Sequence, residues 1–498
     1  MGEKRYADAL ALIYETNALP SITGHICDHA CQYHCTRLDY EGCVLIREVK
    51  RLAVTKGMEE YRQKWLAPNN KRPAKVAILG AGPAGLASAY FLAREGLEAT
   101  VFDPHESAGG TVRHVIPRFR ISDEVIDNDI NFIKDHGVEF VFRSDPDLTP
   151  DSLLGQGFDY VVVAVGAAAE KTFRLDGHNP KTGPQVLPAL EFLARFNANS
   201  ASLNLGRHVA VLGAGNTAMD AARTALRLPG VKTVNVLYRR TEKEMPAYRE
   251  EYKMALADKV SFHFQLNPEQ VTDDGRLVCR VMKLGEPDGT GRRRPEPTED
   301  LREFAFDTLI TAIGEDIDRD LLQRLGIDKS SPAIPESQSE RIFLAGDANI
   351  GPSSIARCIA DGRKVADAIC QVVDPPWSRK QITFSSTTAE RASEIARKKL
   401  GLTRQAKAPA EGSVSLDLAV GDQEFQRCLE CNSVCNKCVE VCPNRANIAL
   451  RVEAAGLRNY YQIIHLDAYC NECGNCATFC PWDGKPYSDK ITDRKSVV

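Results

Sequence analysis

Cysteines at regular spacing are the residues of this chain with the clearest chemistry. The chain holds sixteen cysteines. Near the C-terminus they follow the pattern C-x2-C-x2-C-x3-C before Pro481, at Cys470, Cys473, Cys476 and Cys480. An earlier group repeats this pattern with one inserted residue and one spare cysteine, at Cys428, Cys431, Cys435, Cys438 and Cys442. Paired runs of this kind hold two 4Fe–4S clusters, and the last cysteine of each run ligates the other cluster.

This crossover rule predicts two sets of ligands. The first cluster takes Cys431, Cys435, Cys438 and Cys480. The second takes Cys470, Cys473, Cys476 and Cys442. Cys428 competes with Cys431 for the first position of its run. Four thiolates also suit zinc, but the C-x2-C-x2-C-x3-C-P spacing, without paired C-x2-C knuckles, favours iron–sulfur clusters.

A third group near the N-terminus has a less standard spacing, at Cys27, Cys31, Cys35 and Cys43. All four could hold one cluster, or three could do so together with a group that is not a cysteine. Three interleaved histidines leave zinc as an alternative, at His25, His29 and His34. Because two other clusters are predicted, we favour a role in electron transfer. We expect ordinary burial for the remaining cysteines, Cys279, Cys358 and Cys370.

A glycine-rich motif follows a short apolar run at residues 76–79. Gly80 suits a tight turn, Gly82 a close approach of backbone to a pyrophosphate, and Gly85 the packing of a helix on a strand. The glycine-rich run also contains Pro83 and Ala84 and leads into a helix, whose N-terminal amides favour phosphate. Asp103, about twenty residues further on, is placed to bond a ribose hydroxyl. Strand, helix and acid in register predict a dinucleotide site.

A second motif of this type follows residues 208–212 and predicts another dinucleotide site, at Gly213, Gly215, Asn216, Thr217 and Ala218. Its second strand ends in Arg239 and Arg240 instead of an acid. Arginine can form paired hydrogen bonds with a 2′-phosphate, so the motif favours NADP(H) over NAD(H). The alternative is that both arginines are solvated surface residues.

A segment near residue 347 completes the prediction of a flavin site. Asp347 follows an apolar strand and Gly346, and a helix is expected to begin near Ser353. In flavoproteins with two nucleotide domains, such an aspartate bonds the ribityl chain and the helix directs its N-terminus at the flavin. The expected cofactor-binding residues further include Ser354, Ile355, Gly110, Arg118, Gly166 and Gly314. No pair of side chains demands a role as nucleophile or general base.

Elements that position these motifs can be read from the hydrophobic pattern. With 498 residues the chain is too long for one core. Residues 75–374 alternate short apolar runs with amphipathic helices, which is typical of parallel α/β layers. We predict an α/β protein with two Rossmann-like domains. The predicted parts are a helical Fe–S segment (1–70), an FAD domain in two pieces (71–195 and 315–375), an NAD(P)H domain (196–314), a linker (376–425) and a ferredoxin-like 2×4Fe–4S domain (426–498).

Bulk composition points to an ordinary globular protein. Hydrophobic residues make up 43% of the chain, charged residues 26%, and the formal net charge is −4. This balance gives no reason to expect nucleic acid or a membrane surface as a partner. No stretch approaches the roughly eighteen apolar residues of a spanning helix, and residues 1–20 lack the pattern of a signal peptide. We expect a cytoplasmic protein.

Several motifs together resemble one family. They include GHICDHACQYHCTRLDYEG, LGAGPAGLASAY, IPRFRI, LGAGNTAMDAARTALR, LYRRTEKEMPA and LAGDANIGPSSIARCIADGRKVADAI. Nearly the whole chain is similar to the glutamate synthase small-subunit family. That family includes the flavin half of dihydropyrimidine dehydrogenase and the large subunit of electron-bifurcating transhydrogenases. With its C-terminal cysteines, the chain most resembles the FAD/Fe–S half of proteins assigned as selenate reductases.

This resemblance implies a route for electrons and also two departures. NADPH would give hydride to FAD, and single electrons would then reach the clusters. Family members usually carry a further cysteine run before the position of Cys27, so we expect one cluster to be missing or supplied by another subunit. Lys50 stands where the family has a ligating Gln or Glu, and an ammonium cannot bind iron. We hypothesise that Cys43 replaces that ligand.

Three functions are compatible with these residues. The first is an NAD(P)H-dependent subunit that exchanges electrons with a separate reductase subunit. The second is a stand-alone NAD(P)H:ferredoxin oxidoreductase or a component of a bifurcating transhydrogenase. The third is a non-catalytic electron-relay scaffold, against which the intact glycines of both motifs argue. We favour the first.

Overall fold

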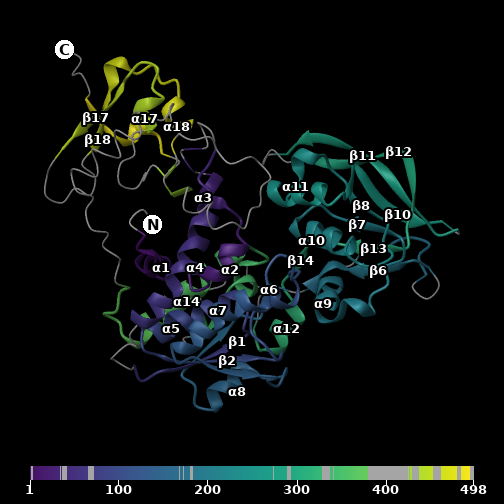
Figure 1. The fold of residues 1–498 in the computed structure, drawn as a ribbon, viewed down its shortest axis with the longest axis horizontal. Coiled ribbons are helices and arrows are strands. Elements are labelled where there is room, and N and C mark those ends of the chain that lie inside the picture. The colour runs from purple at the N-terminus through teal and green to yellow at the C-terminus, as the bar shows by residue number, and fades with distance from the viewer. Residues whose placement is uncertain are drawn as a thin grey trace. The chain divides into compact units, whose positions relative to one another are not determined.

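The computed structural model divides the chain into two compact units. It describes residues 4–33, 42–64, 72–167, 169–171, 173–179, 183–272, 274–288, 293–327, 337–339, 341–379, 437–452, 461–478 and 484–493, with the single positions 1, 35, 37, 424, 425, 427, 428 and 480. The large unit comprises residues 14–28 and 65–379 (Figure 1). The small unit comprises residues 1–13, 29–64 and 380–498.

The first parallel sheet of the large unit has the strand order β15-β16-β4-β1-β2-β3. Its strands are β1 (Lys75–Leu79), β2 (Glu98–Asp103), β3 (Glu139–Phe142), β4 (Tyr160–Val163), β15 (Ser337–Ser339) and β16 (Ile342–Leu344). Only the β15–β16 pairing is antiparallel. Strand β1 is apolar at four consecutive positions, because a central parallel strand is covered on both faces.

Helices cover both faces of this sheet. On one face lie α5 (Pro83–Arg94), α7 (Asp123–Asp135) and α14 (Ile355–Val373), as Figure 1 shows. On the other, α8 (Pro150–Gly155) and α12 (Arg319–Arg324) pack leucines against the strands. Helix α14 crosses α5 closely at Gly362, where an added Cβ would collide with the carbonyl oxygen of Ala84. Three short helices complete the described part of this domain, α2 (Pro20–His25), α6 (Thr111–His114) and α13 (Asp347–Ile350).

A second parallel sheet has the strand order β6-β13-β7-β8-β9. Its strands are β6 (Gln185–Pro188), β7 (His208–Leu212), β8 (Thr233–Tyr238), β9 (Ser261–Phe264) and β13 (Thr308–Thr311). Helices α9 (Ala189–Asn199), α10 (Asn216–Ala225) and α11 (Arg249–Ala257) pack on one face. Strand β6 pairs with β13, although the expected boundary at residue 196 assigns β6 to the first nucleotide domain.

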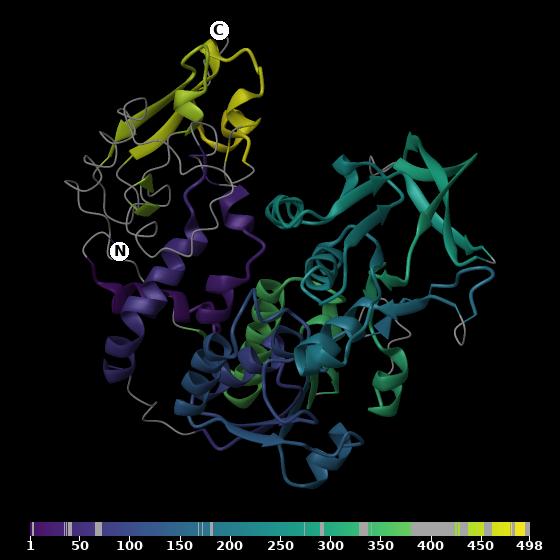
Figure 2. The same ribbon diagram turned by 45° about the vertical axis from the view of Figure 1, so that its right-hand side comes forward.

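The other face of the second sheet is covered by a three-stranded antiparallel sheet. It consists of β10 (Leu266–Val271), β11 (Arg276–Pro287) and β12 (Arg293–Ala305), and its apolar side chains join the strands in one core. The long hairpin of β11 and β12 stands out from the rest of the second domain (Figure 2). Where the chain crosses between the two parallel sheets, β5 (Ala169–Glu170) and β14 (Glu315–Asp316) form a short antiparallel ribbon.

The small unit combines helices with a small sheet. Helices α1 (Tyr6–Tyr14, its last residue in the large unit), α3 (Ala30–Tyr33), α4 (Ile46–Lys64) and α17 (Lys437–Glu440) precede the sheet, and α18 (Asn475–Thr478) and α19 (Pro486–Asp489) lie between its last two strands. The sheet consists of β17 (Asn447–Arg451), β18 (Tyr461–Leu466) and β19 (Ile491–Asp493). Helix α4 passes α1 at Gly57, where a Cβ would lie 2.6 Å from the backbone of Tyr6.

In the small unit, a buried set of hydrogen bonds connects Arg37, Gly42 and Leu45 with Glu424 and Arg427; we call this set the joint. The Arg427 guanidinium bonds the Glu424 carboxylate and the Gly42 carbonyl, and Leu45 N donates to Glu424 Oε2 over 2.9 Å. Arg37 Nε in turn donates to the Arg427 carbonyl over 2.8 Å. The backbone around Cys43 and the start of the cysteine group at Cys428 therefore belong to one folded body. In the described part of the chain, no helix combines the length and apolarity needed to cross a bilayer.

Candidate functional site

A cavity of about 1620 Å³ lies in the large unit, where the carboxyl ends of strands from both parallel sheets meet. Crevices at this end of parallel strands are the usual ligand sites of α/β sheets. Single small-molecule sites measure roughly 300–1,000 Å³, so this cavity has room for more than one such ligand. Both glycine-rich motifs line it, with Gly80, Gly82, Pro83 and Ala84 from the first and Gly213, Gly215, Asn216 and Thr217 from the second.

The glycines of the first motif are required for different reasons. Gly80 has a φ of +105°, and an added Cβ would lie 2.5 Å from the Ala164 carbonyl oxygen. A Cβ on Gly85, which does not line the cavity, would collide with the Gly80 carbonyl. At Gly82, by contrast, a Cβ would meet nothing within 4 Å. The protein itself therefore needs Gly80 and Gly85, whereas Gly82 only keeps space open in the cavity for a ligand.

The N-terminus of α5 adds a binding feature to this space. Gly82 is its N-cap, and no side chain caps the first turn. Free amides at a helix N-terminus bind phosphate. Gly110 packs against Gly82 from the other side, since its Cβ would lie 2.7 Å from Gly82 Cα. These features fit the pyrophosphate of FAD.

Asp103 lines the cavity at the end of β2 and already accepts three hydrogen bonds. Ala81 N donates to Oδ2 over 2.7 Å, and His105 donates to Oδ1 from its backbone N at 2.9 Å, with ring Nδ1 also at 2.9 Å. A carboxylate has about four acceptor sites, so capacity remains for the predicted ribose hydroxyl. The His105 ring stacks on His114, whose pKa is lowered by burial and by His105.

The second motif repeats this arrangement. Gly213 has a φ of +124°, and a Cβ would collide with the Ala312 carbonyl, whereas Gly215 is nearly free of neighbours. Helix α10 begins here without a side-chain cap. Arg239 and Arg240 line the cavity after β8. Arg240 is only 9% exposed, and its Nε has no hydrogen-bond partner among the described residues.

A buried guanidinium with an unused donor favours an anionic ligand. The cavity therefore offers a cation where an adenosine 2′-phosphate would lie, and this fits NADP(H). Gly166 and Gly314 also line the cavity, both with positive φ, at +78° and +104°.

Asp347 lines the cavity beside the N-terminus of α14. Its Oδ1 accepts hydrogen bonds from Ser353 Oγ (2.7 Å) and Cys358 Sγ (3.2 Å). Burial raises the pKa of Asp347, and it raises the pKa of Cys358 to about 12, so Cys358 remains a thiol donor near neutral pH. The helix starts at Ile355 with Ser354 as its cap, two residues later than predicted.

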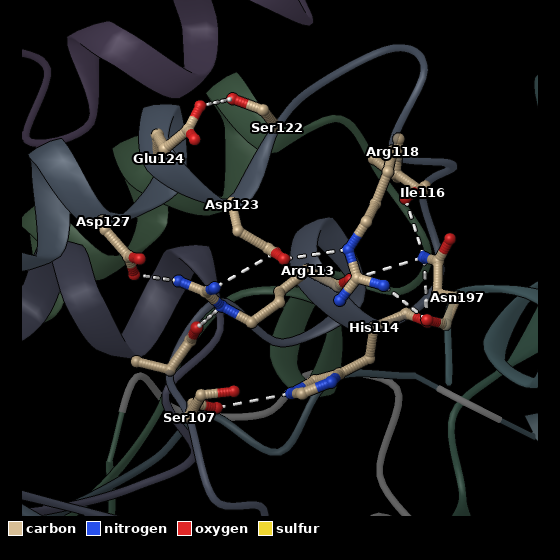
Figure 3. Close-up of polar contacts among 11 residues, drawn as sticks. Ser107, Arg113, His114, Ile116, Arg118, Ser122, Asp123, Glu124, Asp127 and Asn197 are labelled. Atoms are coloured by element: carbon tan, nitrogen blue, oxygen red, sulfur yellow. Dashed lines mark hydrogen bonds and ion pairs between the residues drawn. The ribbon is translucent and has the colours of Figure 1, made fainter. Parts of the chain in front are cut away.

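Cys358 is buried, as expected, but it also lines the cavity and holds Asp347, a role that sequence reasoning missed. Four of the predicted cofactor-binding residues do not line the cavity: Gly85, Arg118, Ala218 and Gly346. Arg118 instead bonds Asp123 and the Asn197 carbonyl, as Figure 3 shows. Ala218 lies in the core of the second domain, and Gly346 packs against Ala84.

Four cysteines surround a small hollow in the small unit: Cys442, Cys470, Cys473 and Cys476. They are the set that the crossover rule assigns to one cluster. Ala446 N donates to Cys442 Sγ (3.1 Å) and Glu472 N to Cys470 Sγ (3.3 Å), and such bonds to sulfur tune cluster potentials. No three His, Cys, Asp or Glu side chains of the described chain converge on a single ion.

The ligand set predicted for the other C-terminal cluster is described only in part. Cys438 is buried in the small hydrophobic cluster of this unit, and Cys480 Sγ accepts from Gly484 N over 3.3 Å. Cys431 and Cys435 lie outside the described residues. Cys428 is half-buried beside Arg427.

The N-terminal cysteines divide between the two units. Cys27 lines the large cavity, and α2 before it is anchored by Asp129, which accepts from the backbone N of Ser21 (3.0 Å) and Ile22 (2.8 Å). In the small unit, Cys31 is exposed, and Cys35 Sγ accepts from Val44 N over 3.5 Å.

Cys43 is half-buried in the same unit. Burial raises the pKa of its thiol, and the nearby Cys35 raises it further. The buried amide of Gln32 reaches Cys43 Sγ over 3.7 Å, a neighbour that the sequence analysis did not single out. His34 lies outside the described residues.

Comparisons with known proteins agree with this geometry. Residues 74–362 match the pyridine nucleotide-disulphide oxidoreductase family, and residues 1–62 match the 4Fe–4S domain II of dihydropyrimidine dehydrogenase. "Putative oxidoreductase YgfK" of Escherichia coli K12 is 48% identical over 99% of this chain. The match covers 47% of that relative, so the chain spans about half its length.

In two further comparisons the match covers most of the similar protein's own length. The small chain of NADPH glutamate synthase from E. coli K12 is 33% identical, over 74% of this chain and 83% of its own length. The solved structure of FprA from Mycobacterium tuberculosis in complex with NADPH shares the fold, with a TM-score of 0.52 and 17% identity. That match covers 70% of this chain and all of FprA.

Proposed function

Because the chain belongs to the pyridine nucleotide-disulphide oxidoreductase family and is related to the glutamate synthase small chain, we propose a function in electron transfer. In this proposal the chain moves electrons between NADP(H) and a partner reductase subunit. It is an NAD(P)H-dependent flavin and iron–sulfur oxidoreductase with an FAD/NAD(P)-binding region and a 4Fe–4S domain. When bound, FAD accepts a hydride from NADPH and releases its two electrons singly to 4Fe–4S clusters.

One observation carries the proposal: both glycine-rich motifs open into the same cavity. The amides at the start of α5, with Asp103 and Asp347, would hold FAD in the first half. The amides at the start of α10, with Arg240, would hold NADP(H) in the second half. A shared cavity would allow the reacting rings to meet without either nucleotide leaving its domain.

The location of Cys27 supports a route for electrons out of this cavity. Cys27, one of the predicted ligands of the N-terminal cluster, lines the cavity that would hold the flavin. In the small unit, Arg427 bonds the carbonyls of Gly42 and Cys43, so Cys43 lies close to the start of the cysteine group at Cys428. Cys473 is exposed at the hollow, which suits an exit toward an acceptor.

The names of relatives support a partner subunit. They include the subunit beta of an NADPH-Fe(3+) oxidoreductase from Geobacter sulfurreducens and the subunit beta of an NADP(+)-dependent formate dehydrogenase from Moorella thermoacetica. We assign the substrate-reducing step to a partner subunit of such a complex. The exposed Cys473 favours free ferredoxin as a second candidate acceptor.

An anaerobic titration tests the proposal. The purified holoprotein is titrated with NADPH and then NADH while flavin and cluster absorbance are followed together. We expect NADPH to bleach the flavin and the broad cluster absorption in turn. A bound flavin that neither nucleotide reduces would refute the enzymatic function. Addition of oxidised ferredoxin to the reduced chain separates the two acceptors, because only the second candidate function predicts rapid reoxidation.

A further inference from the structure

Residues 113–120 run from the last turn of α6 toward α7, and we call this segment the interdomain strap. Its first residue is anchored in the first domain. Arg113 Nε donates to the Ala108 carbonyl over 2.6 Å, Nη1 bonds Asp123 over 3.1 Å, and Nη2 pairs with Asp127 (Figure 3). The Arg113 side chain is 9% exposed, so these bonds hold the start of the strap firmly on α7.

From this anchor the strap reaches the second domain at α9. Asn197 Nδ2 lies within 2.9 Å of the Ile116 carbonyl, 3.2 Å of the His114 carbonyl and 3.4 Å of the Arg113 carbonyl. Arg118 returns a bond to the Asn197 carbonyl, and Figure 3 shows the two side chains facing one another. Val115 packs against the hydrophobic core of the second domain.

The strongest contact of the strap is a buried ion pair at its end. Arg120 Nη1 bonds both carboxylate oxygens of Asp220, at 2.7 and 2.6 Å, and Nη2 pairs with Glu251. The three side chains are 13%, 8% and 9% exposed. Asp220 lies on α10 and Glu251 on α11, so Arg120 joins the first domain to two helices of the second.

Phe119 adds a contact on the outside of the strap. Its ring lies 4.1 Å from Arg227 Cζ and 5.2 Å from Arg223 Cζ. Both arginines bond Asp258, at 2.8 and 2.9 Å, so the ring packs on a fixed surface of the second domain.

The location of the ion pair indicates that Arg120 positions the two domains for the reaction in addition to stabilising the fold. Arg120, Asp220 and Glu251 all line the nucleotide cavity. Asp220 lies four residues after Asn216 on α10, and residues at this spacing share a helix face. The carboxylate that holds Arg120 is therefore on the same face of α10 as the second glycine-rich motif. Movement of α10 relative to Arg120 would move the bound NADP(H) relative to the first domain.

We propose that the interdomain strap, through the Arg120–Asp220–Glu251 contact, fixes the two nucleotide domains in the orientation that brings nicotinamide to the flavin. Arg120 is a positioning residue. It acts through α10 and α11 and neither donates nor accepts the hydride. This inference rests on the proposed transfer from NADPH to FAD, and short displacements of reacting groups are known to slow such steps strongly.

Full-length holoprotein with Arg120→Gln tests the proposal, because the variant keeps hydrogen-bonding capacity but loses the charged fork. Flavin content and NADP⁺ affinity are measured first, then the long-wavelength charge-transfer absorbance of the NADPH complex and the single-turnover rate of flavin reduction. We expect flavin content and NADP⁺ affinity within about twofold of wild type. The charge-transfer band should weaken, and flavin reduction should slow at least tenfold. Arg120→Lys should recover part of both.

Arg280→Gln is the matched control. Arg280 also pairs with a carboxylate, Glu269 at 2.8 Å, but it lies in the three-stranded sheet and does not line the cavity. We expect wild-type behaviour from this variant. Hydrogen–deuterium exchange in β5 and β14 gives a readout that is independent of redox chemistry. It should rise in Arg120→Gln because the domains are no longer fixed, and remain unchanged in Arg280→Gln.

A normal charge-transfer band, rate and exchange pattern in Arg120→Gln would overturn the proposal. If Arg120→Gln does not retain FAD, the variants Asp220→Asn and Asn197→Ala are measured instead. The same three readouts then test whether the strap fixes the domains. If wild type itself is not reduced by NADPH, the proposed function fails, and the exchange measurement still decides whether the strap fixes the domains.

Discussion

Removal of the Arg240 guanidinium should change the choice between NADPH and NADH. Arg240 is 9% exposed, lines the cavity after β8 and has an Nε without a partner among the described residues. A hydrogen bond to a charged group contributes about 1.5–3 kcal/mol. Each 1.36 kcal/mol corresponds to about tenfold in rate or affinity. We therefore expect Arg240→Ala to lower kcat/KM for NADPH by roughly tenfold to a hundredfold.

NADH lacks the 2′-phosphate, so its kcat/KM should be unchanged or slightly higher in Arg240→Ala. The assay is anaerobic reduction of an artificial acceptor at several concentrations of each nucleotide, with flavin content measured in parallel. Arg239→Ala is the matched control, because Arg239 lines the same cavity but is exposed and should have the smaller effect. Equal losses with both nucleotides would refute the assignment of Arg240 to the 2′-phosphate.

Three further predictions follow from other parts of the chain. Gly82→Ala should lower flavin per chain with little change in the stability of the apoprotein, because its Cβ would enter open cavity. Gly85→Ala should instead destabilise the fold by about 1–3 kcal/mol, as urea unfolding would show. Burial lowers the pKa of His136 to about 4, below about 6.5 in the unfolded chain, so the unfolded state binds protons more readily. The free energy of unfolding should then fall by up to about 3 kcal/mol as the pH drops from 6.5 to 4. If His136→Gln shows the same pH dependence of urea unfolding as wild type, His136 is not the cause. Cys43→Ser should remove roughly four iron atoms per flavin if Cys43 completes the N-terminal cluster. Cys279→Ser, at a buried thiol in the second domain, is the control, and unchanged iron in Cys43→Ser would exclude Cys43 as a ligand.

Local motifs were predictable because their physical requirements are local. The positive φ of Gly80, the packing of Gly85 on the Gly80 carbonyl and the open space at Gly82 are features of one strand–turn–helix unit, although Gly80 also lies close to Ala164 after β4. The same holds for the spacing of Cys470, Cys473 and Cys476, which line one hollow. A short stretch of chain satisfies each requirement, so residue type and spacing are sufficient to recognise it.

Arg118 illustrates where this reasoning fails. Arg118 was expected to bind a cofactor, but it does not line the cavity and bonds Asp123 and the Asn197 carbonyl. Arg120, which does line the cavity, meets Asp220 and Glu251 at separations of 100 and 131 residues. A pattern within one segment contains no information about a partner so distant in the chain.

What the sequence by itself determined is therefore the class of chemistry: two nucleotide motifs, three groups of cysteines and an oxidoreductase of the glutamate synthase small-chain type. Tertiary structure alone decided which residues share the cavity, including Cys27, Arg120 and Cys358. It also decided that β6 pairs with β13 in the second sheet. These outcomes depend on how whole layers pack, and packing adds contacts between segments that local spacing does not constrain.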